Sequence, residues 1–127
     1  ESDKFADDLV LQNGFVMAVV TESITALNSL TIRNHGTMTC HVKEWNTANV
    51  EVYNNGYLYM HGATTAKSIA FMSAKEGIND VCLDVDCDVL NVVSRGKGVL
   101  RYRGKANDVE VSARGKHCTI YTSELNR

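Results

Sequence analysis

Short strands of alternating apolar and polar residues recur along this chain about every 20 residues, and each leads into a turn that contains glycine. Five copies of the strand begin at Leu30, Val50, Ile69, Leu90 and Val109, in steps of 20, 19, 21 and 19 residues. A weaker copy begins at Leu9. Equivalent positions carry similar residue types, as stacking of similar units requires, because each unit buries its apolar positions on those of the next.

A second alternating strand follows each glycine; Met38, Cys40 and Val42 are the apolar positions of one example. A period of two indicates that one face of the strand is buried and the other solvated. A unit of about 20 residues is too short for a strand–helix–strand crossover, and no segment has a convincing helical period. The pattern therefore predicts an all-β fold, a short right-handed parallel β-helix. An antiparallel β-sandwich is the alternative.

The length of 127 residues predicts a single domain, residues 1–127. We expect residues 26–127 to form about five coils and residues 1–25 to form an N-terminal strand or cap. An open solenoid end exposes unpaired strand edges, so each end needs a cover. Residues 121–127 are the candidate cover at the other end, and contact between the coil ends of two copies, giving a homo-oligomer, is the alternative.

Composition narrows the classes of protein. The net charge is −2, so no overall basic field suggests nucleic acid. There is no proline, so nine glycines, helped by Asn and Asp, make the turns.

The longest apolar run, residues 15–20, is too short for a bilayer, which needs about 20 residues. The chain opens with Glu1, Ser2 and Asp3, unlike a signal peptide. We expect neither a transmembrane segment nor a signal peptide within this chain.

The four cysteines are Cys40, Cys82, Cys87 and Cys118, and no pair has the spacing of a zinc site. We expect Cys40 and Cys87 to be small buried apolar side chains. A disulfide between cysteines on adjacent coils is the alternative.

No motif in the chain indicates catalysis. A nucleophile motif, a phosphate loop and a dinucleotide fingerprint are all missing; Gly96 and Gly98 follow a strand, but no helix follows them. We therefore expect no enzyme activity, no cofactor and no bound metal.

Aromatic and hydroxyl side chains gather on the outward face of two consecutive repeats. The two rows are Thr37, Thr39 and His41 in one repeat and Tyr57, Tyr59 and His61 in the next. In a stacked fold these rows lie about 4.8 Å apart. Exposed tyrosines can stack on sugar rings, so Tyr57, Tyr59, His41 and His61 are candidate contacts for a glycan or a protein. The alternative is a cross-strand ladder that stabilises the sheet. A metal at His41 and His61 would need a third ligand, which the sequence does not place.

Four aspartates, Asp80, Asp84, Asp86 and Asp88, lie close together in one repeat. Carboxylates suit calcium, but alternate residues of a strand lie about 7 Å apart, which is wide for a single ion. We expect a solvated face instead, with ion pairs to Arg101 and Arg103 on the next coil.

The C-terminal third is basic: residues 95–117 carry a net charge of +5 and the remaining chain carries −7. The candidate contact residues there are Arg95, Lys97, Arg101 and Arg103. Such a region could recognise an anionic glycan or an acidic protein surface, or join the basic end of one molecule to the acidic end of another. Few aromatic residues are interleaved, so a nucleic-acid partner is not expected. The alternative is a charged edge that keeps the solenoid soluble.

Residues 91–106, Asn-Val-Val-Ser-Arg-Gly-Lys-Gly-Val-Leu-Arg-Tyr-Arg-Gly-Lys-Ala, resemble the late coils of the auto-transporter adhesin, head GIN domain family. Coils of that family carry a strand, then Ser-Gly-Ser-Gly, then a short strand ending in glycine. Residues 109–115 repeat the first half of the motif, residues 83–86 resemble another coil, and residues 5–20 resemble the start of the family. The turns here are larger, and the last two copies are basic. The resemblance implies an exported bacterial surface domain with a role in adhesion and no catalytic residues.

Together these features predict a noncatalytic domain exported to the bacterial cell envelope (periplasm, outer membrane or cell surface), with an adhesin-like role in binding a glycan or a protein. A structural β-helix that self-assembles end to end, like the bactofilins, is the alternative. A polysaccharide-processing enzyme could use Asp84, Asp86 and Arg101, but the chain has no long loops to wall a cleft.

Overall fold

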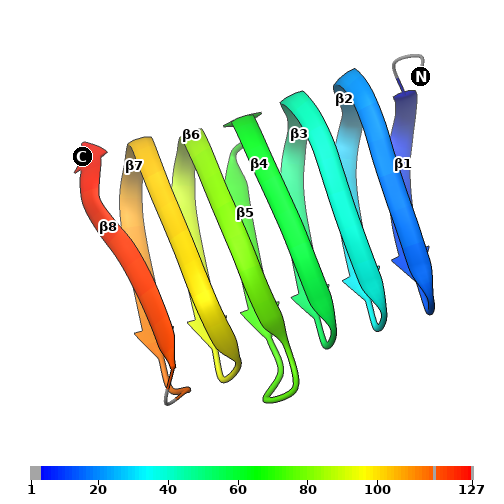
Figure 1. Ribbon diagram of the computed structural model, residues 1–127. Coiled ribbons are helices and arrows are strands. Elements are labelled where there is room, and N and C mark those ends of the chain that lie inside the picture. Colours follow the sequence, from blue (N-terminus) through cyan, green and yellow to red (C-terminus); the bar gives the residue numbers. More distant parts are fainter. Residues whose placement is uncertain (1–3, 116, 127) are drawn as a thin grey trace.

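The computed structural model describes residues 4–115 and 117–126. This part of the chain contains no helix, and so none that could cross a membrane. Eight strands follow one another (Figure 1): β1 (Lys4–Asn13), β2 (Val16–Asn34), β3 (Thr37–Asn54), β4 (Tyr57–Thr65), β5 (Ser68–Ser73), β6 (Ile78–Ser94), β7 (Lys97–Ala113) and β8 (Cys118–Asn126).

The strands wind into a parallel β-solenoid of about six turns, with coils of about 20 residues. In Figure 1 the chain ascends in front, curves over the upper edge, descends behind and turns at the lower edge into the next coil, which is a right-handed winding. All pairings between the described strands are parallel, including β2 with β3 and β6 with β7. The predicted parallel β-helix is confirmed, and the antiparallel sandwich is wrong.

The strand register follows the sequence repeat residue by residue. The predicted strand starts are direct partners, in the order Leu9, Leu30, Val50, Ile69, Leu90 and Val109. Small differences in coil length are absorbed where the strands bend, since the register shifts between Ala26 and Ser29 and between His41 and Glu44. The alternation of inward and outward residues is thereby kept in every coil.

Each coil has two faces and two edges. The front face comprises the outward side chains of segments 16–21, 37–42, 57–61, 78–82 and 97–101. The back face comprises those of segments 8–13, 29–34, 49–54, 68–73, 89–94 and 108–113. The turn edge consists of the turns that lead from back to front, such as 55–56 and 95–96, and the bend edge of the curved stretches on the opposite side.

Inward side chains form one continuous apolar core. The largest fully buried side chains include Ile24, Ile32, Trp45, Leu58, Leu83 and Tyr102. Burying a large apolar side chain is worth about 1.5–3 kcal/mol, so stacked coils stabilise one another through this core. Cys40 and Cys87 are buried in it, as predicted, and all four cysteines are free thiols.

Buried amides line the corner between the back face and the turn edge. Asn13 Nδ2 donates to Asn34 Oδ1 at 2.9 Å, and Asn34 Nδ2 donates to Asn54 Oδ1 at 2.9 Å. Asn54 Nδ2 donates to Asn79 Oδ1 at 2.8 Å, and Asn79 Nδ2 donates to Ser73 Oγ at 2.9 Å. We call these five residues the amide ladder. Sequence reasoning used the asparagines only as turn formers, whereas their side chains lie inside the solenoid, where each finds a partner.

Glycines are needed at the turn edge because successive turns meet backbone to backbone. The N–H of Tyr57 donates to the carbonyl oxygen of Gly36 at 2.8 Å. A Cβ on Gly56 would overlap that same oxygen, and a Cβ on Gly36 would overlap the carbonyl oxygen of Phe15. Only a residue without a side chain lets the turns stack at the strand spacing.

The two ends of the solenoid continue the strand pattern. Residues 1–3 of the expected N-terminal cap lie outside the described residues, whereas residues 4–25 pair with the next coil in the common register. At the other end β8 pairs with β7, and residue 127 lies outside the described part. Phe15 and Val16 in the first coil are 88% and 80% exposed.

Candidate functional site

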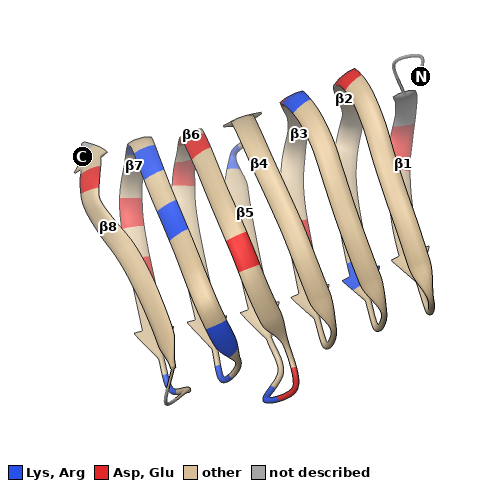
Figure 2. Cartoon of the chain, viewed as in Figure 1, with Lys and Arg blue, Asp and Glu red and all other residues tan. Residues whose placement is uncertain are grey.

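Four lysine and arginine side chains line a groove on the turn edge near the later coils. The groove has a volume of about 670 Å³, and its basic lining residues are Lys75, Arg95, Lys97 and Arg114, beside His117. Figure 2 shows the corresponding basic colour in the lower loops that follow β5, β6 and β7, and the loop after β5 also carries acidic colour beside it. We call this feature the turn-edge groove.

Stacking of the turns brings these side chains together. The N–H of Arg95 donates to the carbonyl oxygen of Ser73 at 3.0 Å, and the N–H of Arg114 donates to that of Ser94 at 2.7 Å. The two arginines therefore occupy equivalent positions in consecutive coils. Adjacent coils lie about 4.8 Å apart, so the positive charges form a row along the solenoid axis.

The charges of the turn-edge groove are not neutralised within the described part of the chain. No ion pair there involves Lys75, Arg95 or Lys97, and no carboxylate lines the groove. Arg114 Nε donates to the neutral Ser112 Oγ at 3.1 Å. Lys116 lies outside the described residues. Like charges held this close repel one another, and a bound anion would relieve that repulsion.

Arg101 and Arg103, the other two basic residues singled out from the sequence, lie outside this groove. Arg103 Nε is 2.9 Å from Asp84 Oδ1, which confirms the predicted pair with an aspartate. Arg101 instead lies 2.6 Å from Glu124, through Nη2 and Oε1, so its predicted pairing with an aspartate is wrong. The hydrogen bond and the charge of Glu124 raise the pKa of Arg101. A carboxylate thus offsets the positive charge of Arg101 and of Arg103, whereas no ion pair within the described residues offsets the charges of Arg95 and Lys97.

The aromatic rows lie on the front face in the predicted register. The partners are Thr37 with Tyr57, Thr39 with Tyr59, and His41 with His61. Adjacency on consecutive coils is therefore confirmed for all six residues.

Tyr59 is packed against both histidines. The centroids of the Tyr59 and His61 rings are 4.1 Å apart with an angle of 5° between the rings, and His41 lies 5.3 Å away, tilted by 41°. Nε2 of His61 is in turn 3.0 Å from Oδ1 of Asp80. The His61 ring covers one face of Tyr59, which favours a stabilising ladder at that position. Tyr57 is 38% exposed and packs against no other ring in the described part, so it stays a predicted contact residue.

A groove of about 680 Å³ runs beside these rings towards the bend edge, lined by His41, Lys43, Tyr59, His61 and Asp84 among others. Its charged groups already have partners, because Lys43 Nζ lies 3.3 Å from Glu22 and Asp84 is paired with Arg103. The groove is therefore polar but has little net charge to offer a ligand.

The four aspartates are spread over different partners. Asp80 contacts His61, Asp84 contacts Arg103, and Asp88 accepts a hydrogen bond of 3.1 Å from Asn107 Nδ2. Asp84, Asp86 and Asp88 are exposed, which confirms the expected solvated face. Across residues 4–115 and 117–126 there is no group of three or more His, Cys, Asp or Glu residues that could hold a metal ion.

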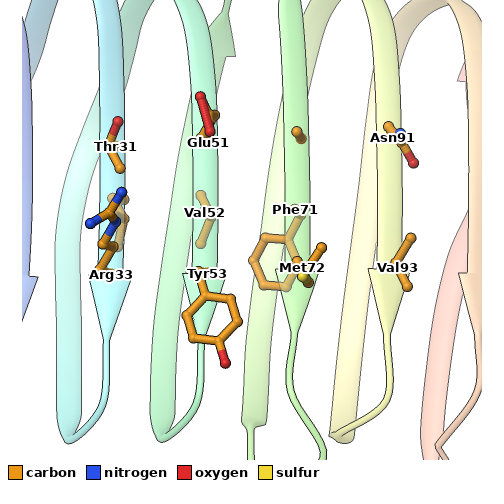
Figure 3. Close-up of a pocket in the computed structure, with 11 residues that line it drawn as sticks. Thr31, Arg33, Glu51, Val52, Tyr53, Phe71, Met72, Asn91 and Val93 are labelled. Atoms are coloured by element: carbon orange, nitrogen blue, oxygen red, sulfur yellow. The ribbon is translucent and has the colours of Figure 1, made fainter.

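Sequence reasoning missed a depression of about 360 Å³ on the back face (Figure 3). Its outward lining residues include Arg33, Glu51, Tyr53, Ala70, Met72 and Asn91, which come from β2, β3, β5 and β6. The signal was present in the repeat: Ala70 aligns with Thr31, Glu51 and Asn91, so one small residue interrupts a row of larger ones. We call this feature the back-face depression.

Comparison of the chain with models of protein families, with curated proteins and with solved structures gave no match. The likeness to the GIN domain family therefore stays a prediction from the sequence. The function has to be argued from the chemistry of the surfaces just described.

Proposed function

We propose that this protein is a noncatalytic binding domain that attaches to an acidic polysaccharide through its turn-edge groove. The observation that carries the proposal is the clustering of four lysine and arginine side chains around one groove, with no carboxylate among its described lining residues. A polymer with a carboxylate or sulfate on its repeating sugars is a ligand of complementary charge.

A linear polymer suits the groove because the charges are arranged in a row. Arg95 and Arg114 lie at equivalent positions in neighbouring coils, and Lys75 lies in the turn before them. One exposed ion pair is worth only about 0.2–1 kcal/mol, so useful affinity requires several anionic groups on one ligand. A repeating acidic polymer supplies them at high effective concentration.

Nucleic acid is the other common polyanion, and the lining of the groove favours it less. Among the residues that the structure describes, no Phe, Tyr or Trp side chain lines the groove. Binding of single-stranded nucleic acid relies largely on stacking of bases on aromatic rings. A saccharide bound through its charged groups needs no such ring.

We extend the proposal to the location of the protein, at the bacterial cell envelope or surface. Residues 91–106, which resemble exported coils, support this part. Fractionation of cells that express the full-length gene tests it: we expect the protein in the periplasmic, outer-membrane or surface fraction. Recovery in the cytoplasmic fraction alone would contradict this part.

Titration with polygalacturonate, followed by isothermal titration calorimetry, tests the binding site. The test variant combines Arg95→Gln, Lys97→Gln and Arg114→Gln. We expect it to bind about tenfold more weakly than the unmodified protein, because three of the charges that face the polymer are lost. Binding of the unmodified protein should also weaken as salt is added, since exposed charges are screened.

The matched control combines Lys43→Gln, Lys67→Gln and Lys105→Gln, three exposed lysines of the bend edge. It changes the net charge equally but leaves the groove intact, so we expect affinity within about twofold of the unmodified protein. Equal losses in both triple variants would show that net charge alone matters and would reject the groove. Equal affinity for neutral dextran, or tighter binding of DNA, would reject the acidic polysaccharide.

A further inference from the structure

The back-face depression combines a small floor with polar walls. Ala70 lies between Glu51 and Asn91, its partners on the two neighbouring coils. These two residues are two coils apart, so their Cα atoms are separated by about 10 Å. Figure 3 shows the side chains of Glu51 and Asn91 on either side of this floor, with Met72 and Tyr53 further along the strands. The volume of about 360 Å³ falls within the range of sites for small ligands.

The polar walls can bind hydroxyl groups from two sides. The Glu51 carboxylate only accepts hydrogen bonds, whereas the Asn91 amide both accepts and donates. The Arg33 guanidinium, at the margin, only donates. Within the described part of the chain neither Glu51 nor Arg33 forms an ion pair, so both are available. A pair of neighbouring hydroxyls, each a donor and an acceptor, matches this mixture.

An apolar wall completes the depression. Met72 is 52% exposed, although it is a large apolar side chain in the middle of the sheet. Tyr53, its partner on the neighbouring coil, is half-buried and packs against His35, with ring centroids 5.9 Å apart. This contact restrains the Tyr53 ring beside the depression. An aromatic ring next to hydrogen-bonding groups offers one surface to the C–H face of a sugar and another to its hydroxyls.

Charge distinguishes this site from the turn-edge groove. Among the described residues one acidic and one basic side chain, Glu51 and Arg33, face the back-face depression, so these residues give it no excess charge that would select an ion. We propose that the back-face depression binds a neutral sugar ring, with Tyr53 and Met72 against its apolar face and with Glu51 and Asn91 on its hydroxyls. This inference does not rest on the acidic polysaccharide, because the two sites share no lining residue.

Saturation-transfer NMR with a panel of neutral pyranoses (glucose, galactose, mannose and N-acetylglucosamine) tests the proposal. We expect at least one sugar to bind the unmodified protein with a dissociation constant in the millimolar range or below. Ala70→Leu fills the floor while keeping the surrounding groups, and Asn91→Ala removes one wall. Each substitution should weaken binding about tenfold. The leucine side chain would occupy the space that the sugar ring needs, and Asn91→Ala would remove a hydrogen-bonding partner of the sugar.

Ala63→Leu, at another exposed alanine, is the matched control and should leave sugar binding unchanged. The triple variant of Arg95, Lys97 and Arg114 should also bind the sugar normally, which separates this site from the turn-edge groove. The proposal is overturned if no sugar of the panel binds at up to about 10 mM, or if Ala70→Leu binds as well as the unmodified protein. Preferential binding of short peptides at an Ala70-dependent site would replace the sugar with a peptide.

Discussion

Asn34 donates a hydrogen bond of 2.9 Å from its Nδ2 to Oδ1 of Asn54, its partner on the next coil, and both side chains are fully buried. The same Asn34 amide donates to the carbonyl oxygens of Gly36 and Tyr57, at 3.1 and 2.7 Å. One side chain thus joins its own turn to the following coil. Buried networks of this kind stabilise a fold only when every member finds a partner.

Asn54→Ala should lower the free energy of unfolding by about 2–4 kcal/mol. The substitution removes the donor to Asn79 Oδ1 and the acceptor of the Gly56 N–H, both in the buried corner. Urea denaturation measures the effect. Asn49→Ala, which removes hydrogen bonds from an exposed asparagine of the same strand, should cost less than about 1 kcal/mol. Similar losses in the two variants would contradict the importance of the amide ladder.

Gly56→Ala should destabilise the protein by about 2–4 kcal/mol, because its Cβ would overlap the carbonyl oxygen of Gly36 and force two stacked turns apart. Gly14→Ala is the control, since a Cβ at Gly14 meets no atom of the described residues within 4 Å. Its free energy of unfolding should stay within about 0.5 kcal/mol of the unmodified value. Thermal or urea denaturation of both variants checks the difference, and a neutral Gly56→Ala would refute close turn stacking.

Tyr102→Phe should raise the free energy of unfolding by about 1 kcal/mol. Tyr102 is fully buried, and no hydrogen-bond partner for its hydroxyl exists in the described part of the chain. Removing the hydroxyl removes the cost of burying it while keeping the ring. Tyr121→Phe, at an exposed tyrosine, serves as the comparison in urea denaturation and should have little effect. A clear loss of stability in Tyr102→Phe would mean that the hydroxyl has a partner.

Alkaline pH should lower the free energy of unfolding, because the thiols of Cys40 and Cys87 keep their protons in the folded state. Burial raises the pKa of Cys40 from 9.0 to about 12, and burial together with Asp86 and Asp88 raises that of Cys87 to about 11. Below pH 9 both states hold these protons. As the pH rises from there towards the folded pKa values, the unfolded chain releases protons that the folded chain keeps, so the free energy of unfolding falls.

Urea denaturation in a reducing buffer at pH 8 and at about pH 10 measures this fall. Cys40→Val, which removes one of the buried thiols, should make the dependence on pH shallower. An equally steep dependence in Cys40→Val would show that Cys40 is not one of the groups responsible.

Much of the fold could be predicted because the repeat itself encodes the register. In a parallel solenoid the partner of a residue is the residue one coil further on, so a spacing of about 20 residues predicts which side chains are neighbours. The pairing of His41 with His61 followed from this spacing alone. The ion pair between Arg101 and Glu124 did not follow from the spacing. A long exposed side chain can contact either neighbouring coil, and here Arg101 contacts the later one.

The fold class, the coil length, the inward positions and the order in which side chains stack can all be read from the sequence, since they depend on period and alternation. How the turns and bends direct side chains becomes visible only in the folded molecule. The tertiary structure placed the side chains of Asn34 and Asn54 inside the solenoid and brought Arg95 and Lys97 together in a groove that no carboxylate of the described residues lines. It also made Ala70 the floor of a depression. The physical reason is that the period of a repeat specifies the partner of each residue along the solenoid axis. The direction of a side chain at a turn depends instead on the path of the backbone. The depth of a surface depression depends on the volumes of side chains from three coils together.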